Sequence, residues 1–370
     1  MINLHGLILA DRSSSQLSGL VKPRTSASLP FAGRYRLIDF ALSAMQNALV
    51  RDVGVIMQHD YQSLLDHLGS GKEWDMSRKR GGLRLLPPFG LKEERRGQYS
   101  SIIDALTSVQ GYIRDIQQDY ICLCRGSLAA NIDLAEVMRR HVSSGADVTV
   151  VCSDRNPESS HYRFVTDEHG FATELLKHHG GKGEGYASLE VYIMSKKTLL
   201  GIIERCERFI DSKFHRTGLG GILASGGRIA VYMHHGYAAH INSVSSYYSA
   251  SMDMLQAQNR HELFPDERPV RTKGRADVST HYAEGASVKN CLVADGCYIE
   301  GSIENCIIFR GVQIHKDAVL KNCIIMQDSI IDNGANLSYV IADKDVEIGV
   351  LEYLSGSPRF PLVLPKGTVI

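Results

Sequence analysis

The 370-residue sequence has no long hydrophobic run. No apolar stretch approaches the roughly 20 residues that a membrane-spanning helix needs, and the start, Met1-Ile2-Asn3, has no basic cluster of the kind that opens a signal peptide. A charge excess is also missing, because 41 basic and 41 acidic residues cancel. A chain without a basic excess has no electrostatic footprint for nucleic acid. These absences predict a cytoplasmic protein with neither a membrane nor a nucleic-acid partner.

The eight cysteines lack the CxxC spacing that marks many zinc sites. Cys122 and Cys124 alternate within an apolar run that is typical of a strand. Buried thiols of a cytoplasmic protein stay reduced and behave as small apolar side chains. We therefore predict no metal site at the cysteines.

Glycine is missing from the first turn of the chain. The apolar run Gly6–Ala10 is typical of a buried parallel strand. Such a strand at the start of a chain commonly leads into a glycine-rich turn that wraps phosphates. The turn here reads Asp11-Arg12-Ser13-Ser14-Ser15-Gln16. The strand alone does not decide whether a phosphate loop has been lost or never existed.

Residues 1 to about 250 alternate short apolar runs with helical patterns. Strands separated by helices predict an α/β domain with a mostly parallel sheet, which binds ligands at the carboxyl ends of its strands. A further helix is predicted over 245–260 and is expected to close this domain, and a polar, proline-containing linker is expected to follow. The predicted strands are His5–Leu9, Val53–Met57, Tyr120–Cys124, Asp147–Cys152, Ser188–Met194 and Arg228–Met233, and the helices Ile38–Leu49, Tyr61–Leu68, Ser100–Asp115, Leu134–Ser143 and Lys197–Cys206.

Three similar segments follow from about residue 283. They read VKNCLVADGCYI from Val288, IENCIIFRGVQI from Ile303 and LKNCIIMQDSII from Leu320. Their offsets of 15 and 17 residues are close to the roughly 18 residues of a three-sided β-helix coil. Stacked coils of this kind bury one continuous apolar core, and the repeated Asn-Cys pairs are predicted to form a ladder. The predicted domains are 1–260, a linker at 261–282, and 283–370.

Residues 29–58, LPFAGRYRLIDFALSAMQNALVRDVGVIMQ, resemble a block of the bacterial ADP-glucose pyrophosphorylases (glucose-1-phosphate adenylyltransferases) that reads P-F-G-G-x-Y-R-x-I-D-F-x-L-S-N. Further matches lie at 69–88 (GSGKEWDMSRKRGGLRLLPP), at 295–314 and at 340–348 (VIADKDVEI). The resemblance covers nearly the whole chain. It implies a Rossmann-like, GT-A-like nucleotidyltransferase domain followed by a left-handed parallel β-helix.

Enzymes of this family transfer an adenylyl group from ATP to glucose 1-phosphate. The reaction needs groups that hold the triphosphate, carboxylates that hold Mg²⁺, and a placed sugar phosphate. The family's phosphate loop reads L-A-G-G-x-G-[ST]-R-L, and its three glycines are absent from Leu9–Leu17. Its arginine corresponds to Gln16, and the lysine of a following R-A-K-P motif corresponds to Ser26. The resemblance therefore indicates a phosphate loop that has decayed.

The metal-holding positions also depart from the family. The family's S-G-D-H reads Arg125-Gly126-Ser127-Leu128 here, so Ser127 replaces an aspartate. In the segment that matches G-Y-W-x-D-V-G-T, His240 replaces the second aspartate. A serine and a histidine are poor ligands for Mg²⁺, which prefers hard oxygen donors. We therefore expect no catalytic residue among Gln16, Ser26, Ser127 and His240, and no bound cofactor.

Traces of the sugar-phosphate site remain by resemblance. Lys177 corresponds to the lysine of the family's E-K-P motif, and Ser188 to the serine of its A-S-M-G loop. We expect vestigial substrate binding from these two residues. Glu190 replaces the glycine of that loop and is expected to crowd and repel an anion.

Arg24 and Arg36 occupy two positions at which the family binds phosphorylated effectors. The chain matches the family along most of its length but lacks the family's catalytic groups. The resemblance therefore implies a non-catalytic companion subunit, such as the degenerate GlgD type known in some bacteria. Such a subunit would join catalytic subunits in a regulated, allosteric tetramer, or form a homo-oligomer. The alternatives are a weakly active adenylyltransferase, an acyltransferase that uses the β-helix, and a stand-alone sensor of sugar phosphates or nucleotides.

Overall fold

The computed structural model describes residues 3–10, 15–57, 60–87, 101–155, 161–177, 183–209 and 213–370. The chain divides by compactness into two units, each made of three separate stretches. The α/β unit comprises Met1–Arg12, Ile38–His240 and Leu263–Arg271, and the β-helix unit comprises Ser13–Leu37, Ile241–Glu262 and Thr272–Ile370. The units found in the structure therefore differ from the domains predicted from the sequence, 1–260 and 283–370, because each unit draws on several stretches of the chain.

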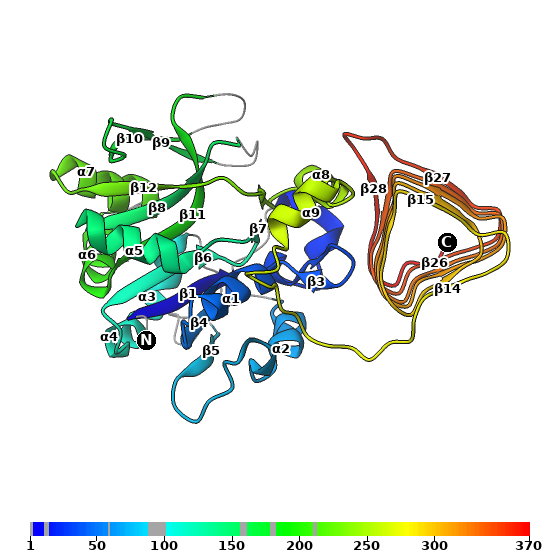
Figure 1. Ribbon diagram of the computed structural model, residues 1–370, viewed down its shortest axis with the longest axis horizontal. Helices are drawn as coiled ribbons and strands as arrows, with labels where there is room; N and C mark the ends of the chain where they lie inside the picture. The colour runs from blue at the N-terminus through cyan, green and yellow to red at the C-terminus, as the bar shows by residue number, and fades with distance from the viewer. Residues whose placement is uncertain are drawn as a thin grey trace. The chain divides into compact units, whose positions relative to one another are not determined.

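A nine-stranded mixed sheet forms the α/β unit (Figure 1). Its main path runs β10-β9-β11-β6-β1-β4-β5, and β8 joins β11 to β12. Strands β1, β4, β5 and β6 are mutually parallel, whereas β11 is antiparallel to β6, β8 and β9. The strands are β1 (Leu4–Ala10), β4 (Asp52–Met57), β5 (Gly82–Leu86), β6 (Tyr120–Arg125), β8 (Val148–Ser153), β9 (Tyr162–Thr166), β10 (Ala172–Lys177), β11 (Tyr186–Ser195) and β12 (Ile229–His234).

Helices cover this sheet through apolar side chains. Strand β1 is buried at every position, as expected for a strand covered on both faces. Helix α6 packs on β6 and β11, and α5 packs on β8, β11 and β12. The helices of this unit are α1 (Ile38–Asn47), α2 (Gln62–Leu68), α3 (Ile102–Ser108), α4 (Gln110–Asp115), α5 (Leu134–Ser144), α6 (Lys196–Glu207) and α7 (Gly220–Ala224), with a π-helical turn η5 (Phe214–Leu219) and a 3-10 turn η3 (Lys72–Trp74).

The predicted strands and helices of this unit are confirmed to within a residue or two, with one correction. The helix predicted over Ser100–Asp115 is two helices, α3 and α4, which meet at Val109. Val109 has φ −108° and ψ 17°, and Ser108 Oγ donates to the carbonyl of Ala105 at 2.7 Å. A serine that bonds back to the preceding turn competes with the helical ladder, and this interrupts the helix.

Three parallel sheets, one on each side of every coil, form the left-handed β-helix (Figure 1). This confirms the fold class predicted from the repeats. The inward side chains are apolar and buried, and they form one continuous cluster. The sheets contain β14 (His281–Tyr282), β17 (Tyr298–Ile299), β20 (Gln313–Ile314), β23 (Ile330–Ile331) and β26 (Glu347–Ile348); β15 (Ser287–Lys289), β18 (Ser302–Glu304), β21 (Val319–Lys321), β24 (Asn336–Ser338) and β27 (Tyr353–Ser355); and β16 (Leu292–Val293), β19 (Ile307–Ile308), β22 (Ile324–Ile325), β25 (Val340–Ala342) and β28 (Leu362–Leu364).

The Asn-Cys pairs form the ladder that the repeats predict. The asparagines at 290, 305 and 322 have φ near +50°, which asparagine tolerates better than most residues. Asn290 Nδ2 donates to Asn305 Oδ1 at 2.7 Å. The cysteine of one coil accepts a backbone N–H from the next, at 3.4 Å in both steps. The Asn-Cys pairs thus turn the corner of each coil and fill it.

Two earlier stretches of the chain pack in the β-helix unit. They form 3-10 turns η1 (Ser15–Val21) and η2 (Ser26–Ser28), the hairpin of β2 (Pro30–Phe31) and β3 (Tyr35–Arg36), helix α8 (Val244–Asp253) and most of α9 (Ala257–Leu263). Tyr247 of α8 donates to the carbonyl of Pro30 at 2.8 Å, and Tyr248 to that of Asn322 at 2.9 Å. These bonds explain why the compact unit includes residues far from the repeats.

None of the helices in the described ranges is long and apolar enough to cross a membrane.

Candidate functional site

The two altered metal positions lie close together in the α/β unit. Strand β6 ends at Arg125, and Ser127 lies in the turn that leads to β7 (Leu128–Ala130). Strand β13 (Ala238–His240) pairs antiparallel with β7 and places His240 opposite Leu128. Segments about 110 residues apart therefore meet at the carboxyl end of β6, where an α/β sheet presents its ligand site.

The side chains at these positions do not fit a magnesium ion. Nε2 of His240 lies 3.1 Å from the carbonyl oxygen of Ser188 and donates to it. Burial lowers the pKa of His240 although Glu190 opposes the change, so the imidazole is neutral at pH 7. Ser127 offers only a neutral hydroxyl, whereas Mg²⁺ is held mainly by carboxylates. Nowhere in the described ranges do three or more His, Cys, Asp or Glu side chains gather as metal ligands.

Arg125 and Glu190, two departures from the family pattern, form an ion pair. Nε of Arg125 donates to Oε2 of Glu190 at 2.5 Å, and the side chains are 26% and 8% exposed. Burial raises the pKa of Glu190, but Arg125, His215 and His240 together outweigh burial and lower it to about 2. Glu190 has φ +53° at a bulge of β11, the left-handed conformation that favours the family's glycine. The carboxylate is therefore ionised and held by Arg125.

A cavity of about 360 Å³ opens beside this pair. Lys177, at the end of β10, contributes to its wall, as do Arg125 and Glu190. Ser188 is fully buried, and its hydroxyl accepts the backbone N–H of Glu190 at 3.1 Å. Of the two residues predicted to contact substrate, the structure thus places Lys177 at the cavity and Ser188 behind its wall.

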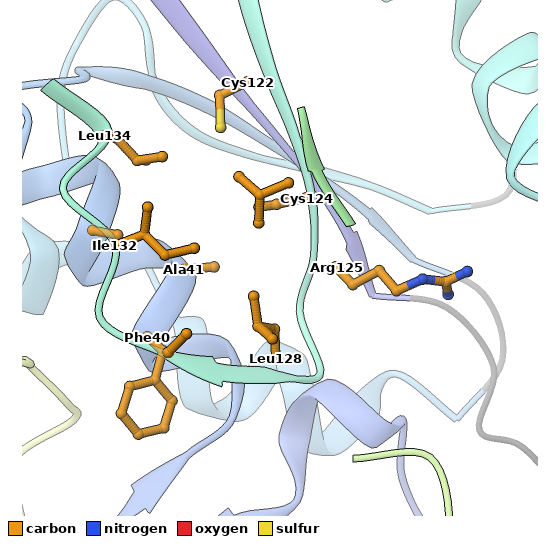
Figure 2. Close-up of a pocket in the computed structure, with 11 residues that line it drawn as sticks. Phe40, Ala41, Cys122, Cys124, Arg125, Leu128, Ile132 and Leu134 are labelled. Carbon is orange, nitrogen blue, oxygen red and sulfur yellow. The ribbon is translucent and has the colours of Figure 1, made fainter. Parts of the chain in front are cut away.

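A second cavity lies behind Arg125 and is too small for a substrate. Its volume of about 20 Å³ is room for a single water molecule. Figure 2 shows the guanidinium end of Arg125 pointing away from Phe40, Ala41 and Ile132, which are among the apolar residues that line this cavity. An apolar cavity of this size stays dry, so it does not extend the site.

The nucleotide-loop positions are described only in part. Residues 11–14 of the predicted phosphate loop lie outside the described residues. Gln16 lies exposed in η1, and Ser26 is buried in η2. Both belong to the β-helix unit, and neither side chain carries the charge that the family uses on phosphate.

Arg24, predicted to bind an effector, is held by a carboxylate of the β-helix. Its two terminal nitrogens donate to the two oxygens of Asp343 at 2.8 and 2.9 Å, with side-chain exposures of 3% and 0%. Arg36 is half-buried in β3. Burial, followed by Arg36 and Arg24, lowers the pKa of Lys344 to about 7. The charges of Arg36 and Arg24 therefore act on Lys344, and Asp343 holds Arg24.

The partners of Arg24 and Arg125 were not predicted from the sequence. Asp343 lies 319 residues from Arg24, and Glu190 lies 65 residues from Arg125. Lys213 and His215, which line the larger cavity, were also missed. One signal was present: Arg125 and Glu190 are opposite charges that both replace uncharged residues of the family motifs.

Comparison with known proteins fits this arrangement. The family described as nucleotidyl transferase matches residues 5–208, and the one described as GlmU-like, C-terminal hexapeptide, matches 277–352. The fold and the site thus define a nucleotidyltransferase domain joined to a hexapeptide β-helix. Over nearly its full length, the chain belongs to the ADP-glucose pyrophosphorylase family, as the following relatives show.

The chain is 36% identical over 370 residues to the glycogen biosynthesis protein GlgD of Bacillus subtilis (strain 168), covering 98% of this chain and 96% of the relative. It is 34% identical to the protein of the same name from Geobacillus stearothermophilus, with the same coverage. A glucose-1-phosphate adenylyltransferase of Clostridium botulinum (strain Alaska E43 / Type E3) is 27% identical over 371 residues, covering 93% and 96%. Both kinds of relative therefore span both domains.

Proposed function

We propose that this chain is a non-catalytic subunit of an ADP-glucose pyrophosphorylase in glycogen biosynthesis, which assembles with a catalytic homologue and changes its activity. The observation that supports the proposal most is that Ser127 and His240, at the two metal positions, do not fit Mg²⁺. His240 is neutral and its Nε2 bonds the carbonyl of Ser188, while Ser127 offers a single hydroxyl. No described residue there supplies the carboxylates that the adenylyl transfer requires.

The size of the expected loss supports an inactive chain. Removing one preorganised stabiliser of charge lowers the rate by roughly 10²–10³, and loss of an essential arginine in phosphoryl transfer by about 10³–10⁵. These effects do not add simply. Gln16, Ser26, Ser127 and His240 nevertheless change the phosphate and metal groups together, so turnover by the chain alone is expected to be negligible.

The β-helix unit supports the assembly part of the proposal. Its last coil exposes apolar side chains, with Leu351 77%, Tyr353 70% and Phe360 80% exposed. Large exposed apolar patches mark interaction surfaces. We propose that this end of the β-helix contributes to a tetramer with catalytic subunits.

The basic cluster of the same unit supports the regulatory part. We propose that a phosphorylated effector binds near Arg24 and Arg36 with Lys344. Since Asp343 holds both terminal nitrogens of Arg24, an anion there would have to compete with this carboxylate. A lysine whose pKa is lowered by burial and by neighbouring cations gains a favourable partner when an anion binds beside it.

Steady-state synthesis of ADP-glucose from Mg-ATP and glucose 1-phosphate tests the proposal. Three samples are compared: this chain, the catalytic homologue from the same organism, and the two co-expressed. We expect no turnover by this chain and a changed kcat or effector response in the mixture. Detectable Mg²⁺-dependent turnover by this chain alone would support the alternative, a weakly active adenylyltransferase, and an ordinary rate would show that Ser127 and His240 do not occupy the metal positions. If the two co-expressed chains elute separately in size-exclusion chromatography and the kinetics of the catalytic homologue are unchanged, the proposed assembly is contradicted.

A further inference from the structure

The chain that leads into the first strand of the β-helix is anchored at both ends. Residues up to Arg271 belong to the α/β unit, and the β-helix unit begins with the next residue. The N–H of Arg271 donates to Ser43 Oγ at 2.9 Å, and its carbonyl accepts from Trp74 Nε1 at 3.2 Å. The β-helix holds the chain again from Arg275 onward. Residues 272–274 therefore form a short joint between two anchored ends.

Four charged side chains hold the far end of this joint. Arg275 donates from its two terminal nitrogens to the two oxygens of Asp328, at 3.1 and 3.0 Å. Its Nε lies 2.8 Å from Oδ1 of Asp277, whose Oδ2 lies 3.7 Å from Nε of Arg310. Arg310 and Asp328 lie at equivalent corners of successive coils, before β20 and β23. Positive and negative charges alternate along these four residues, so the network as a whole is neutral.

The corner of the second coil leaves room for this network. Gly311 has φ +71°, and a Cβ added there would lie 2.3 Å from Oδ1 of Asp328. A side chain at this position would therefore displace the carboxylate that Arg275 bonds. Asp328 itself has φ +59°, a conformation that aspartate adopts more readily than most residues. The turn residues of the coils thus suit the ion pairs.

Charge, rather than apolar burial, holds residues 275–280, which we call the strap. The strap forms neither helix nor strand, Ala276 is exposed, and Val278 is 78% exposed. The side chain of Asp277 is 11% exposed, and among the described residues neither its Oδ2 nor Nε of Arg310 has a hydrogen-bond partner. The coils themselves share one apolar core. Since a segment with few buried apolar contacts opens at a low free energy, the strap can open while the coils stay folded.

We propose that the strap opens and closes as one segment, that the ion pairs of Arg275 are its latch, and that opening extends the joint between the two units from residues 272–274 to residues 272–280. Each freed residue adds up to about 3.5 Å of reach. The strap thus sets how tightly the linker couples the two units. Because salt screens exposed charges but not apolar contacts, the closed strap is weakened at high ionic strength and the coils are not.

Two backbone amides report whether the strap is closed. Gly296 donates its N–H to the carbonyl of Val278 at 2.7 Å, and Cys297 donates its N–H to Thr280 Oγ1 at 3.2 Å. Opening removes both acceptors, so the exchange rate of these two amides measures the open population. The amides of β24, which pairs with β27 of the last coil, are the internal reference.

Hydrogen exchange of the full-length chain, measured by mass spectrometry on short peptides, tests the proposal. The chain is compared in about 10 mM and about 1 M sodium chloride, between which the Debye length falls from about 30 Å to about 3 Å. We expect exchange at Gly296 and Cys297 to rise at least about threefold at the higher concentration. Exchange in β24 should change less than about twofold.

Two variants identify the latch. Arg275→Met should raise exchange at the two reporting amides at least about fivefold in low salt, because it removes several hydrogen bonds to charged groups. It should also abolish most of the salt dependence. Asp328→Asn keeps the shape and the tolerance for positive φ but removes one charge, so its effect should be smaller. Lys321→Met is the matched control, because Lys321 and Glu304 form another exposed ion pair of the β-helix.

Three results would overturn the proposal: exchange at the reporting amides does not depend on salt, Arg275→Met behaves like the control, or exchange in β24 rises in parallel. The last result would show that the whole β-helix opens rather than the strap. The inference goes beyond the proposed function and can fail separately from it. Exchange by the isolated chain needs no partner, and the co-expression assay does not depend on the strap.

Discussion

The two units each contain an arginine paired with a buried carboxylate, and the two pairs differ in how far the arginine is exposed. In the β-helix unit, both terminal nitrogens of Arg24 bond to Asp343, and both side chains are almost inaccessible. In the α/β unit, Arg125 holds Glu190 through Nε and remains 26% exposed at a cavity. We call Arg24–Asp343 the sealed pair, because surrounding side chains bury it, and Arg125–Glu190 the accessible pair, because it lies at the wall of a cavity. The difference teaches that the same kind of ion pair can fix a packed interior or keep charge accessible at the wall of a cavity.

The largest expected effect comes from breaking the sealed pair. Arg24→Ala leaves the Asp343 carboxylate buried without its partner, so we expect a loss of roughly 3–5 kcal/mol in the free energy of unfolding. Urea denaturation measures the loss. The matched control is Lys321→Ala, because Lys321 and Glu304 of the β-helix form a pair whose side chains are 58% and 45% exposed, and such exposed pairs contribute about 1 kcal/mol or less. Equal losses in both variants would contradict the contrast.

Acid should destabilise the α/β unit at pH values at which Glu190 is still ionised. Burial lowers the pKa of both His5 and His215 from 6.5 to about 4. Between pH 6.5 and pH 4 the unfolded chain binds more protons than the folded chain. The stability that the two neutral histidines contribute is therefore present above pH 6.5 and is lost as the pH falls toward 4. The loss should reach roughly 3 kcal/mol for each group. Glu190, with a pKa of about 2, stays ionised throughout this window.

The measurement is the urea midpoint at a series of pH values from 7 to 4. His5→Gln keeps a polar side chain of similar size but removes one titrating group. Its unfolding free energy should depend less steeply on pH in this window. A slope as steep as that of the unaltered chain would show that His5 does not contribute.

Breaking the accessible pair should cost less than breaking the sealed one. Arg125→Met leaves Glu190 unpaired, but its carboxylate can take up a proton or draw water from the adjoining cavity. We expect a loss of about 1–3 kcal/mol, the usual penalty of leaving a buried polar group unsatisfied. The urea midpoint at pH 7 gives the value, and a loss equal to that of Arg24→Ala would remove the distinction between the two pairs.

The smallest effect separates charge from backbone strain at Glu190. Both Glu190→Gln and Glu190→Gly remove the carboxylate, but glycine also relieves the left-handed φ of +53°. We expect the glycine variant to be more stable than the glutamine variant by about 1 kcal/mol. Thermal melts of the two variants measured side by side give this difference, and a less stable glycine variant would argue against strain at this position.

Patterns within short stretches made most of the fold predictable. The apolar runs predicted β1 and β4, and the repeated Asn-Cys pairs predicted the ladder of the β-helix, because both are patterns within short stretches of sequence. The hairpin of β9 and β10 was missed because the exposed face of β10 interrupts its apolar pattern.

The candidate site was predictable only where a motif could be compared. Ser127 and His240 were paired in advance because both replace aspartates of one family site. The partners of Arg24 and Arg125 depend on contacts between distant segments, which no local pattern encodes. Lys213 was missed for the same reason, since its place at the cavity depends on η5 packing beside β11.

The separation of Arg24 from Asp343 has a consequence for synthesis of the protein. The two residues are 319 positions apart, and ribosomes add about 5–20 residues per second. Arg24 therefore leaves the ribosome roughly 15 to 60 seconds before its partner is made. Throughout that interval the segment Ser13–Leu37 has no β-helix to fold against. The nascent chain must carry an unfinished amino-terminal segment until the last coils appear, which makes protection by chaperones most valuable near the end of translation.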